Sequence, residues 1–223
     1  MSSRCLYIRL EVCLLDNEKE RAAELCRKLA EVYPDAKCSL RYEKPYELLI
    51  ATRLSAQCTD ARVNIVTRRL FERYTSLEDF AQADCAELEE IIRPCGLFHT
   101  KAQSIIATAQ MLLKDFGGEI PDTMEALLTL PGIGRKTANL ILGDIYGKPA
   151  IVTDTHCIRI CGRLGLSTGK NPEQVERQLR AVIPPEEGSD FCHRIVLFGR
   201  EYCKAQKPEC DICPLRRDCP QTN

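Results

Sequence analysis

Apolar residues recur at helical spacing along nearly the whole of this chain. The stretch "EKERAAELCRKLAEVY" places Ala22, Leu25 and Leu29 on one stripe, and "ARVNIVTRRLFERY" repeats the spacing. The same pattern predicts further helices over 46–56, 84–93, 99–116, 122–129, 135–146, 155–165, 172–183 and 189–202. No convincing strand pattern follows residue 16, while residues 1–16 fit either a short strand or a disordered segment. The sequence therefore predicts an all-α fold of about ten short helices.

Length and composition are those of an ordinary globular protein. The 223 residues suit one large domain or two modest ones, and charged residues make up 28% of the chain. No run approaches the roughly 18 consecutive apolar residues of a membrane span. Arg9 and Glu11 interrupt the N-terminal "LYIRLEVCLL", which makes a poor signal peptide. We expect a cytoplasmic or nucleoid-associated protein with no membrane partner, although the net charge of −1 does not by itself mark a nucleic-acid binder.

The segment "LPGIGRKTANLIL" has the pattern of two helices joined by a tight hairpin. Pro131 ends the first helix, because the residue before a proline is pushed out of the α region. Gly132 and Gly134 permit a turn in which the backbone approaches a ligand closely. The second helix then begins with amide groups that can bind a phosphate oxygen, although a plain turn between helices is the alternative. Upstream, Asp122 and Glu125 have the spacing of a capping box for the first helix.

Two charged residues near this hairpin have ordinary interpretations when each is taken singly. Lys136 stands in the first turn of the second helix, where its charge opposes the helix dipole at a cost of roughly 0.3–1 kcal/mol. Either it is a solvated surface residue or the position requires an amine. Asp154, within "AIVTDTHCIRICGRL", stands at the start of the next helix, where aspartate is commonly a simple N-cap.

Four of the 14 cysteines lie together near the C-terminus, in the pattern Cys203-x6-Cys210-x2-Cys213-x5-Cys219. Structural zinc sites usually have two short Cys-x2–4-Cys pairs, whereas only one short pair is present here. Four cysteines can also ligate an iron–sulfur cluster, and zinc or free thiols are the alternatives. The remaining cysteines are scattered, and we expect them to be reduced structural thiols.

The hairpin and the aspartate segment together carry a family resemblance. "LPGIGRKTAN" followed by "VTDTH" resembles the helix–hairpin–helix and catalytic segment of the endonuclease III family of DNA glycosylases. The resemblance extends upstream through "PYELLIATRLSAQCTDARVN" and "CGLFHTKAQSI" and downstream through "GKNPEQVE" and "GREYC", and it spans residues 18–219. The uneven spacing of the four clustered cysteines is similar to the 4Fe–4S loop of the same family.

This resemblance implies an architecture of two helical lobes. A six-helix barrel that carries the helix–hairpin–helix motif would span residues 38–148. Residues 1–37 and 149–223 would form the second lobe, with the iron–sulfur cluster loop at 203–219. The implied cofactor is a 4Fe–4S cluster, whose ligands would be Cys203, Cys210, Cys213 and Cys219.

The implied activity is that of a bifunctional DNA N-glycosylase and AP lyase of base excision repair. It would remove oxidised pyrimidines from duplex DNA and nick the abasic site by β-elimination. The catalytic residues would be Lys136 and Asp154, on the two walls of a lesion pocket between the lobes. Lys136 would be the nucleophile, because burial in a cleft and the positive end of the helix dipole both disfavour the charged amine. Asp154 would stabilise the positive charge that develops on the sugar.

The implied partner is double-stranded DNA with damaged bases or abasic sites, bound by a monomer. The damaged nucleotide must leave the base stack, and the resemblance assigns the filling of the vacated space to Gln57, Leu97 and His156. The DNA-binding residues of the hairpin would be Gly132, Ile133, Gly134 and Arg135. Two alternatives stay open: a monofunctional glycosylase of the same superfamily, and a non-catalytic iron–sulfur protein that binds DNA or senses redox state.

Overall fold

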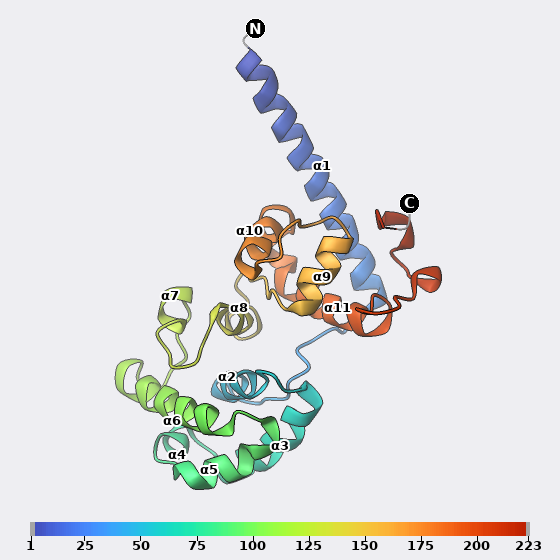
Figure 1. Cartoon of the computed structure of the whole chain (residues 1–223). Helices are drawn as coiled ribbons and strands as arrows, with labels where there is room; N and C mark the ends of the chain where they lie inside the picture. The colour runs from blue at the N-terminus through green and yellow to red at the C-terminus, as the bar shows by residue number, and fades with distance from the viewer. Residues whose placement is uncertain (1–2, 222–223) are drawn as a thin grey trace. The chain divides into compact units, whose positions relative to one another are not determined.

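The computed structural model describes the backbone of residues 3–221 and the side chains of residues 16–221. No strand occurs in the described part, which confirms the predicted all-α class; Figure 1 shows the order of the helices. The α-helices are α1 Ser3–Val32, α2 Pro45–Leu54, α3 Asp60–Arg73, α4 Leu77–Ala81, α5 Cys85–Ile92, α6 Phe98–Asp115, α7 Met124–Leu127, α8 Arg135–Asp144, α9 Thr155–Arg163, α10 Pro172–Val182 and α11 Gly188–Glu201. The 3-10 helices are η1 Arg93–Cys95, η2 Pro185–Glu187, η3 Cys210–Ile212 and η4 Arg216–Asp218.

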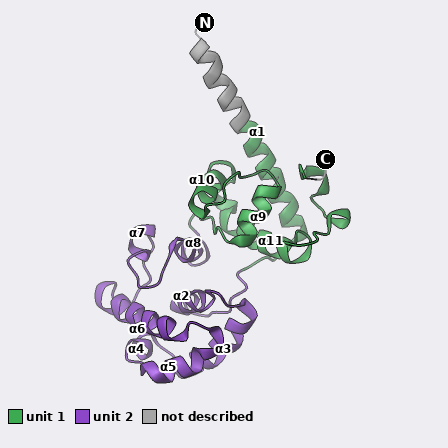
Figure 2. Ribbon diagram, in the orientation of Figure 1, with its two compact units in different colours: residues 1–37, 148–223 green, residues 38–147 purple. Residues whose placement is uncertain are grey.

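The chain divides into two compact units, which Figure 2 distinguishes by colour. Unit 1 combines Met1–Lys37 with Lys148–Asn223 and contains α1 and α9 to α11. Unit 2 is Cys38–Gly147 and contains α2 to α8. Among the described helices, none combines the length and the apolar character that a membrane crossing requires.

Unit 2 is organised around α6, against which α2, α4 and α5 all pack. The centre of its core is aromatic: Phe80 is fully buried, stacks on Tyr74 with ring centroids 5.0 Å apart, and meets Tyr46 and Phe71 edge-on. Burying a side chain of this size contributes roughly 1.5–3 kcal/mol, so the aromatic group is a major source of stability for the unit.

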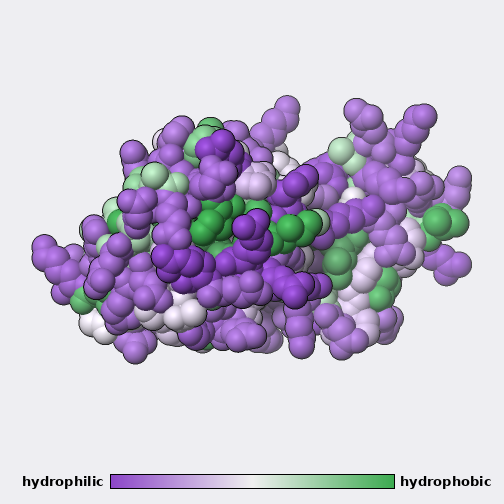
Figure 3. All heavy atoms as spheres, turned by 90° about the horizontal axis from the view of Figure 1, so that it is seen from below, coloured by the Kyte–Doolittle hydropathy of each residue, from purple (hydrophilic) through white to green (hydrophobic). Residues whose placement is uncertain are grey.

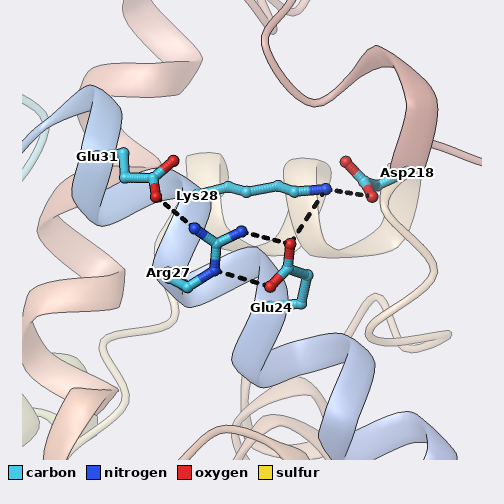
Figure 4. Close-up of polar contacts among 5 residues, drawn as sticks. All are labelled: Glu24, Arg27, Lys28, Glu31 and Asp218. Carbon is cyan, nitrogen blue, oxygen red and sulfur yellow. Dashed lines mark hydrogen bonds and ion pairs between the residues drawn. The ribbon is translucent and has the colours of Figure 1, made fainter.

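In unit 1, α1 packs against α10 and α11, and α9 packs against α11. Figure 4 shows a network of charged residues on α1 that reaches the end of the C-terminal loop. Lys28 Nζ lies 2.8 Å from a carboxylate oxygen of Asp218 and 3.4 Å from Glu24. Arg27 pairs within the helix, with Glu24 at 2.6 Å and with Glu31. The pKa of Glu24 falls to about 2, chiefly because of the hydrogen bond from Arg27. Lys28 therefore joins α1 to the C-terminal loop, whereas Arg27 does not.

The surface carries few large apolar side chains. In the view of Figure 3, hydrophilic residues cover most of the visible surface and hydrophobic residues show only as small separate patches. Among the described residues, the large apolar side chains that are exposed are Ile65, Leu97, Leu128 and Ile212. An isolated exposed apolar residue needs no explanation by itself, so any meaning of these four has to come from their backbone or surroundings.

Most helix boundaries follow the local capping chemistry. Asn171 caps α10 through hydrogen bonds from the amides of Glu173 and Gln174, and Pro172 is its first residue, as predicted. The predicted capping box at Asp122 is wrong, because the N-cap of α7 is Thr123, whose hydroxyl accepts from the amide of Ala126.

Two further helical segments differ from the sequence prediction. The five-residue α4 was not predicted, because it is too short to show a helical period. The short strand considered for residues 1–16 is not formed from Ser3 onward, where α1 begins, and residues 1–2 lie outside the described part.

The Lys28–Asp218 pair generates a testable prediction. Lys28→Met keeps the length of the side chain but removes the link to Asp218, so we expect the free energy of unfolding to fall slightly. Protease cleavage within the loop that follows Glu201 should become faster. Denaturant titration measures the free energy of unfolding, and limited proteolysis measures the rate of cleavage. Arg27→Met is the matched control, since it removes only pairs within α1. Equal acceleration of cleavage in the two variants would contradict the anchoring role.

Candidate functional site

The predicted hairpin lies between α7 and α8, in unit 2. The turn closes through a hydrogen bond from the amide of Ile133 to the carbonyl of Leu130 at 3.1 Å. Gly132 has φ +75°, a left-handed conformation that favours glycine. Gly134 has an extended backbone with φ −105° and is the N-cap of α8. Gly132 is therefore required by the turn, whereas Gly134 matters because it brings no side chain to the helix start.

A hydrogen bond joins the hairpin to α6. Thr108 on α6 donates its hydroxyl hydrogen to the carbonyl of Pro131 at 2.9 Å. Ser104, one turn earlier, accepts a hydrogen bond of 2.7 Å from Arg53 Nε. A Cβ added at Gly132 would lie 2.7 Å from the same Arg53 nitrogen. Side chains of α2 and α6 therefore pack against one side of the turn, and these contacts fix the backbone of the hairpin.

The four hairpin residues expected to bind DNA are not equally accessible. Gly132, Gly134 and Arg135 are exposed, whereas the Ile133 side chain is only 8% exposed. The Ile133 amide is also occupied by the turn hydrogen bond to Leu130. Ile133 therefore anchors the hairpin in the core of unit 2, and its side chain does not form part of the accessible surface.

Lys136 is the second residue of α8, as expected, and its side chain is exposed. Gly134 offers no side-chain cap, and the first backbone bond of the helix runs from the Ala138 amide to the Gly134 carbonyl at 2.9 Å. Of the two features expected around this amine, the helix N-terminus is present and burial is not.

Asp154 belongs to unit 1, where it is the N-cap of α9. Its Oδ1 accepts a hydrogen bond of 2.7 Å from the amide of Cys157, a contact that typically contributes about 1 kcal/mol. The ordinary N-cap interpretation is therefore correct for Oδ1. No hydrogen bond within the described part of the chain involves Oδ2, so the carboxylate is held in place by one oxygen and retains the other.

Three buried thiols lie next to this carboxylate. Cys157 and Cys161 have sulfur atoms 3.9 Å apart, and the Val152 amide donates to Cys192 Sγ at 3.2 Å. Hydrogen bonding to Cys161 raises the pKa of Cys157, and hydrogen bonding to Cys157, together with burial, raises the pKa of Cys192. Cys157 and Cys192 therefore stay neutral, and they behave as small apolar groups next to Asp154.

Gln57 and Leu97, both in unit 2, share an uncommon backbone conformation. Their φ angles are +56° and +49°, in the left-handed region that costs a non-glycine residue of order 1–3 kcal/mol. Gln57 is exposed, and the Leu97 side chain is 54% exposed. Gly96, with φ +67° and ψ 164°, lies in a region that is essentially reserved for glycine and directs the chain into Leu97. Strained backbone at two exposed residues of one unit is a sign of function, because such strain persists only where the surrounding structure enforces it.

His156 is the third wedge residue, as we call the residues expected to fill the vacated space in the base stack. It lies on α9 in unit 1 and is half-buried. Its Nδ1 is 3.2 Å from Arg159 Nη2. A Cβ added at Gly199 of α11 would lie 2.4 Å from the same Nδ1, so the ring rests directly on the glycine. His156 is thus held against α11, in contrast to the free side chain of Leu97.

The cysteine loop is held by two arginines of α9. Arg159 Nη2 donates to the Cys203 carbonyl at 3.0 Å. Arg163 Nη1 donates to the Lys204 carbonyl at 2.7 Å and lies 3.3 Å from Cys203 Sγ, while Cys219 Sγ lies 3.7 Å from the Arg163 carbonyl. Cationic donors beside the sulfurs suit thiolate ligands.

The four clustered thiols share one neighbourhood. Burial raises the pKa of Cys213, and the charges of Cys203, Cys219 and Cys210 raise it further. Among the described residues, no three His, Cys, Asp or Glu side chains are gathered as ligands of a single metal ion. A donor set of four thiols fits an iron–sulfur cluster, which takes four cysteine thiolates.

Sequence reasoning missed Lys101, which is fully buried on α6. Its ammonium lies among backbone carbonyls close to both strained residues, at 2.8–2.9 Å from three of them. One signal was available, since Lys101 falls on the apolar stripe of α6 between Leu97 and Ile105. A lysine on a core stripe requires partners for its charge.

Comparisons with known proteins agree with the site. Residues 50–185 match the family model of the HhH-GPD superfamily base excision DNA repair proteins. Residues 203–219 match the iron–sulfur binding domain of endonuclease III, and this match begins at the first and ends at the last of the four clustered cysteines. The predicted 4Fe–4S cofactor is thereby confirmed.

Curated relatives and solved structures extend over most of the chain. Endonuclease III of Synechocystis sp. is 45% identical over 205 residues, which cover 92% of this chain and 94% of the relative. Endonuclease III of Bacillus subtilis is 43% identical over 193 residues, covering 86% and 88%. The structure of a trapped endonuclease III–DNA covalent intermediate superposes with a TM-score of 0.86 at 44% identity, covering 92% of this chain and 96% of that one.

The ligand assignment can be tested by iron content. We expect the purified protein to hold about four iron atoms per chain and Cys210→Ser to lose most of them, because one thiolate ligand is removed. Cys85→Ser is the control, since Cys85 lies on α5 away from the loop in sequence and pairs with Glu89 at 3.6 Å. Iron retained at the original stoichiometry in Cys210→Ser, measured by a colorimetric iron assay, would refute this ligand.

Proposed function

Because this chain belongs to the endonuclease III family, within the HhH-GPD superfamily of base excision DNA repair proteins, we propose that Lys136 and Asp154 carry its chemistry. The chain binds DNA, and its activity is that of a bifunctional DNA N-glycosylase and AP lyase. One observation carries the residue assignment: an exposed lysine follows an uncapped glycine N-terminus at the second position of α8. In this proposal, the amine at that position lies beside the hairpin amides that bind a phosphate oxygen.

In the proposed reaction, the Lys136 amine attacks the sugar C1′ of the damaged nucleotide. The C1′–N bond breaks, and the base leaves with the bonding electrons and takes up a proton. The attached amine gives up a proton, its lone pair breaks the C1′–O4′ bond, and a protonated Schiff base forms between Lys136 and the opened sugar as O4′ takes up a proton. Loss of a proton from C2′ then expels the 3′ phosphate by β-elimination, and hydrolysis releases the lysine. The covalent intermediate of the related endonuclease III–DNA structure supports a nucleophilic route.

Asp154 has an electrostatic role in this proposal. The bond from the Cys157 amide fixes Oδ1, and Oδ2 is available to stabilise the positive charge that develops on the sugar. The neutral thiols behind it add no competing charge, because the pKa values of Cys157 and Cys192 are raised. The Asp154 carboxylate is thus the charged group that stabilises the positive charge developing on the sugar.

The proposed substrate is duplex DNA that contains an oxidised pyrimidine or an abasic site, bound by a monomer in the nucleoid of the cytoplasm. Extruding the nucleotide costs a few kcal/mol, which a damaged base reduces. Gln57 and Leu97 enter the vacated space, with His156 as a further contact from α9. Gly132, Gly134 and Arg135 hold the phosphates, while Ile133 supports the turn from the core.

The 4Fe–4S cluster, held by Cys203, Cys210, Cys213 and Cys219, gives the loop a fixed shape when bound. Among the basic residues of this loop, Lys204 pairs with Glu209 at 3.0 Å and Arg216 pairs with Asp211 at 2.8 Å. Lys207 and Arg217 have no acidic partner among the described residues. We assign these two exposed residues to the DNA backbone.

The central test is borohydride trapping on an abasic-site duplex. Lys136→Gln should fold, keep its iron and still bind this DNA, because phosphate contacts come from backbone amides and other basic residues. It should lose base release, nicking and the trapped adduct together. A Lys136→Gln protein that still traps would show that another amine is the nucleophile. Base release without a trapped adduct in the unaltered protein would indicate a monofunctional glycosylase. Absence of both base release and trapping in the unaltered protein would indicate a non-catalytic role.

Asp154→Asn supplies the second half of this test. Asparagine is as good an N-cap as aspartate, so the variant should keep α9 intact. Removal of the negative charge should slow base release by about 10²–10³-fold while the trapped adduct remains detectable. Lys114→Gln on α6 is an exposed control that should react at the unaltered rate. Complete loss of trapping in Asp154→Asn would mean that the carboxylate is needed to form the adduct at all.

The wedge role of Leu97 makes a separate prediction. Leu97→Ala removes the group that fills the stack, so base release from duplex should fall by about tenfold, the effect of ~1.4 kcal/mol. The same lesion in single-stranded DNA should be affected far less, because no stack has to be filled. Ile65→Ala on α3 is the control, since Ile65 is equally apolar and is 66% exposed. Equal losses on both substrates would refute the wedge.

A further inference from the structure

Lys101 is a fully buried ammonium whose partners are all backbone carbonyls. Nζ donates to the carbonyls of Leu54 at 2.8 Å, Ala56 at 2.8 Å and Cys95 at 2.9 Å. An ammonium has three donors and no acceptor, so these three bonds satisfy it completely. No acidic side chain of the described residues is among its partners, which means that this lysine holds main chain and is not one half of an ion pair.

The three carbonyls belong to two loops that are distant in the sequence. Leu54 ends α2, and Ala56 immediately precedes Gln57. Cys95 ends η1 and precedes Leu97 by two residues. The amide of Lys101 itself donates to the Leu97 carbonyl at 3.0 Å, so α6 begins directly behind the strained residue. One ammonium therefore fixes the backbone just before each of the two left-handed residues.

We propose that Lys101 is a positioning residue, which holds Gln57 and Leu97 at a fixed separation so that both can enter the base stack. This inference rests on the wedge role proposed above. Both side chains are exposed and both backbones are left-handed, so burial of these side chains does little to keep the two residues in place. The three bonds to Lys101 supply the missing constraint from inside the unit, where hydrogen bonds are stronger than in water.

A neighbouring thiol pair joins the same two loops without adding charge. Burial, followed by Cys58, with which it shares a hydrogen bond, raises the pKa of Cys95 to about 12. Cys58 follows Gln57 directly, so this contact repeats the connection made by Lys101. Lys101 remains the group that orders the loop carbonyls, and a wedge fixed in advance need not be ordered when DNA binds.

The test compares base release from two substrates, a duplex with an oxidised pyrimidine and the same damaged strand unpaired. Lys101→Met keeps the stem of the side chain but removes all three donors. We expect a loss of about 10- to 100-fold on duplex, the effect of misplacing a functional group by about 1 Å, and a much smaller loss on the unpaired strand. Lys114→Met is the control, because Lys114 is an exposed lysine on the same helix.

A double-mutant cycle separates positioning from general support of the fold. If Lys101 acts through Gln57 and Leu97, Lys101→Met should cost little more on duplex once Gln57→Ala and Leu97→Ala are both present, so its loss should not add to theirs. A fluorescent base analogue beside the lesion should also report less unstacking in Lys101→Met at saturating protein. Additive losses, or equal losses on the two substrates, would overturn the proposal.

Lys101→Arg keeps the test decisive if Lys101→Met does not fold. Its planar guanidinium keeps the charge but cannot reproduce three convergent bonds from one nitrogen, so it should show the same preference for loss on duplex. Equal activity of Lys101→Arg and the unaltered protein on both substrates would overturn the proposal. If Leu97→Ala itself shows no duplex-selective loss, the wedge role fails and this inference fails with it. A duplex-selective Leu97→Ala with a nonselective Lys101 variant rejects the Lys101 role alone.

Discussion

A stripe of polar residues on α6 fixes the positions of the hairpin and of the loops before Gln57 and Leu97 in unit 2. Lys101, Ser104 and Thr108 follow one another at intervals of one turn, and each bonds a different segment. The first holds the loops before Gln57 and Leu97, the second receives Arg53 under Gly132, and the third holds the hairpin carbonyl of Pro131. Buried polar groups are costly unless they are bonded, so these segments cannot move independently of the helix.

Unit 1 depends in a comparable way on α9. Asp154 caps its start, and Arg159 and Arg163 follow one and two turns later, where both bond the cysteine loop. The far end of that loop is tied to α1 through Asp218 and Lys28. The helix that presents the carboxylate is therefore braced by the loop that holds the cluster. Loss of the cluster would therefore first alter the position of α9. The contribution of the cluster is then to the structure of unit 1 and not to the chemical step.

The sequence predicted the long helices well, because their apolar period is set by burial alone. It failed where tertiary contacts decide: Thr123 took the cap expected of Asp122, and the burial of the Ile133 side chain within the hairpin was not predicted. Lys136 and Asp154 were proposed only through the family motif, since a lysine in a first turn and an aspartate at an N-cap both have ordinary explanations. The left-handed backbones of Gln57 and Leu97 and the burial of Lys101 follow from contacts between distant loops, which no local pattern records.

The energetics explain why a buried lysine accompanies these two residues. Glycine at both positions would remove the strain of about 2–6 kcal/mol that two left-handed non-glycine residues carry, but it would also remove both proposed wedge side chains. The proposed wedge role thus needs a left-handed backbone and a side chain at the same position. Three hydrogen bonds to a charged donor offset that strain, although burial of the ammonium opposes them and lowers the pKa of Lys101. A neutral side chain in place of Lys101 would offer fewer and weaker bonds, which is why a positive charge in the core suits two exposed left-handed residues.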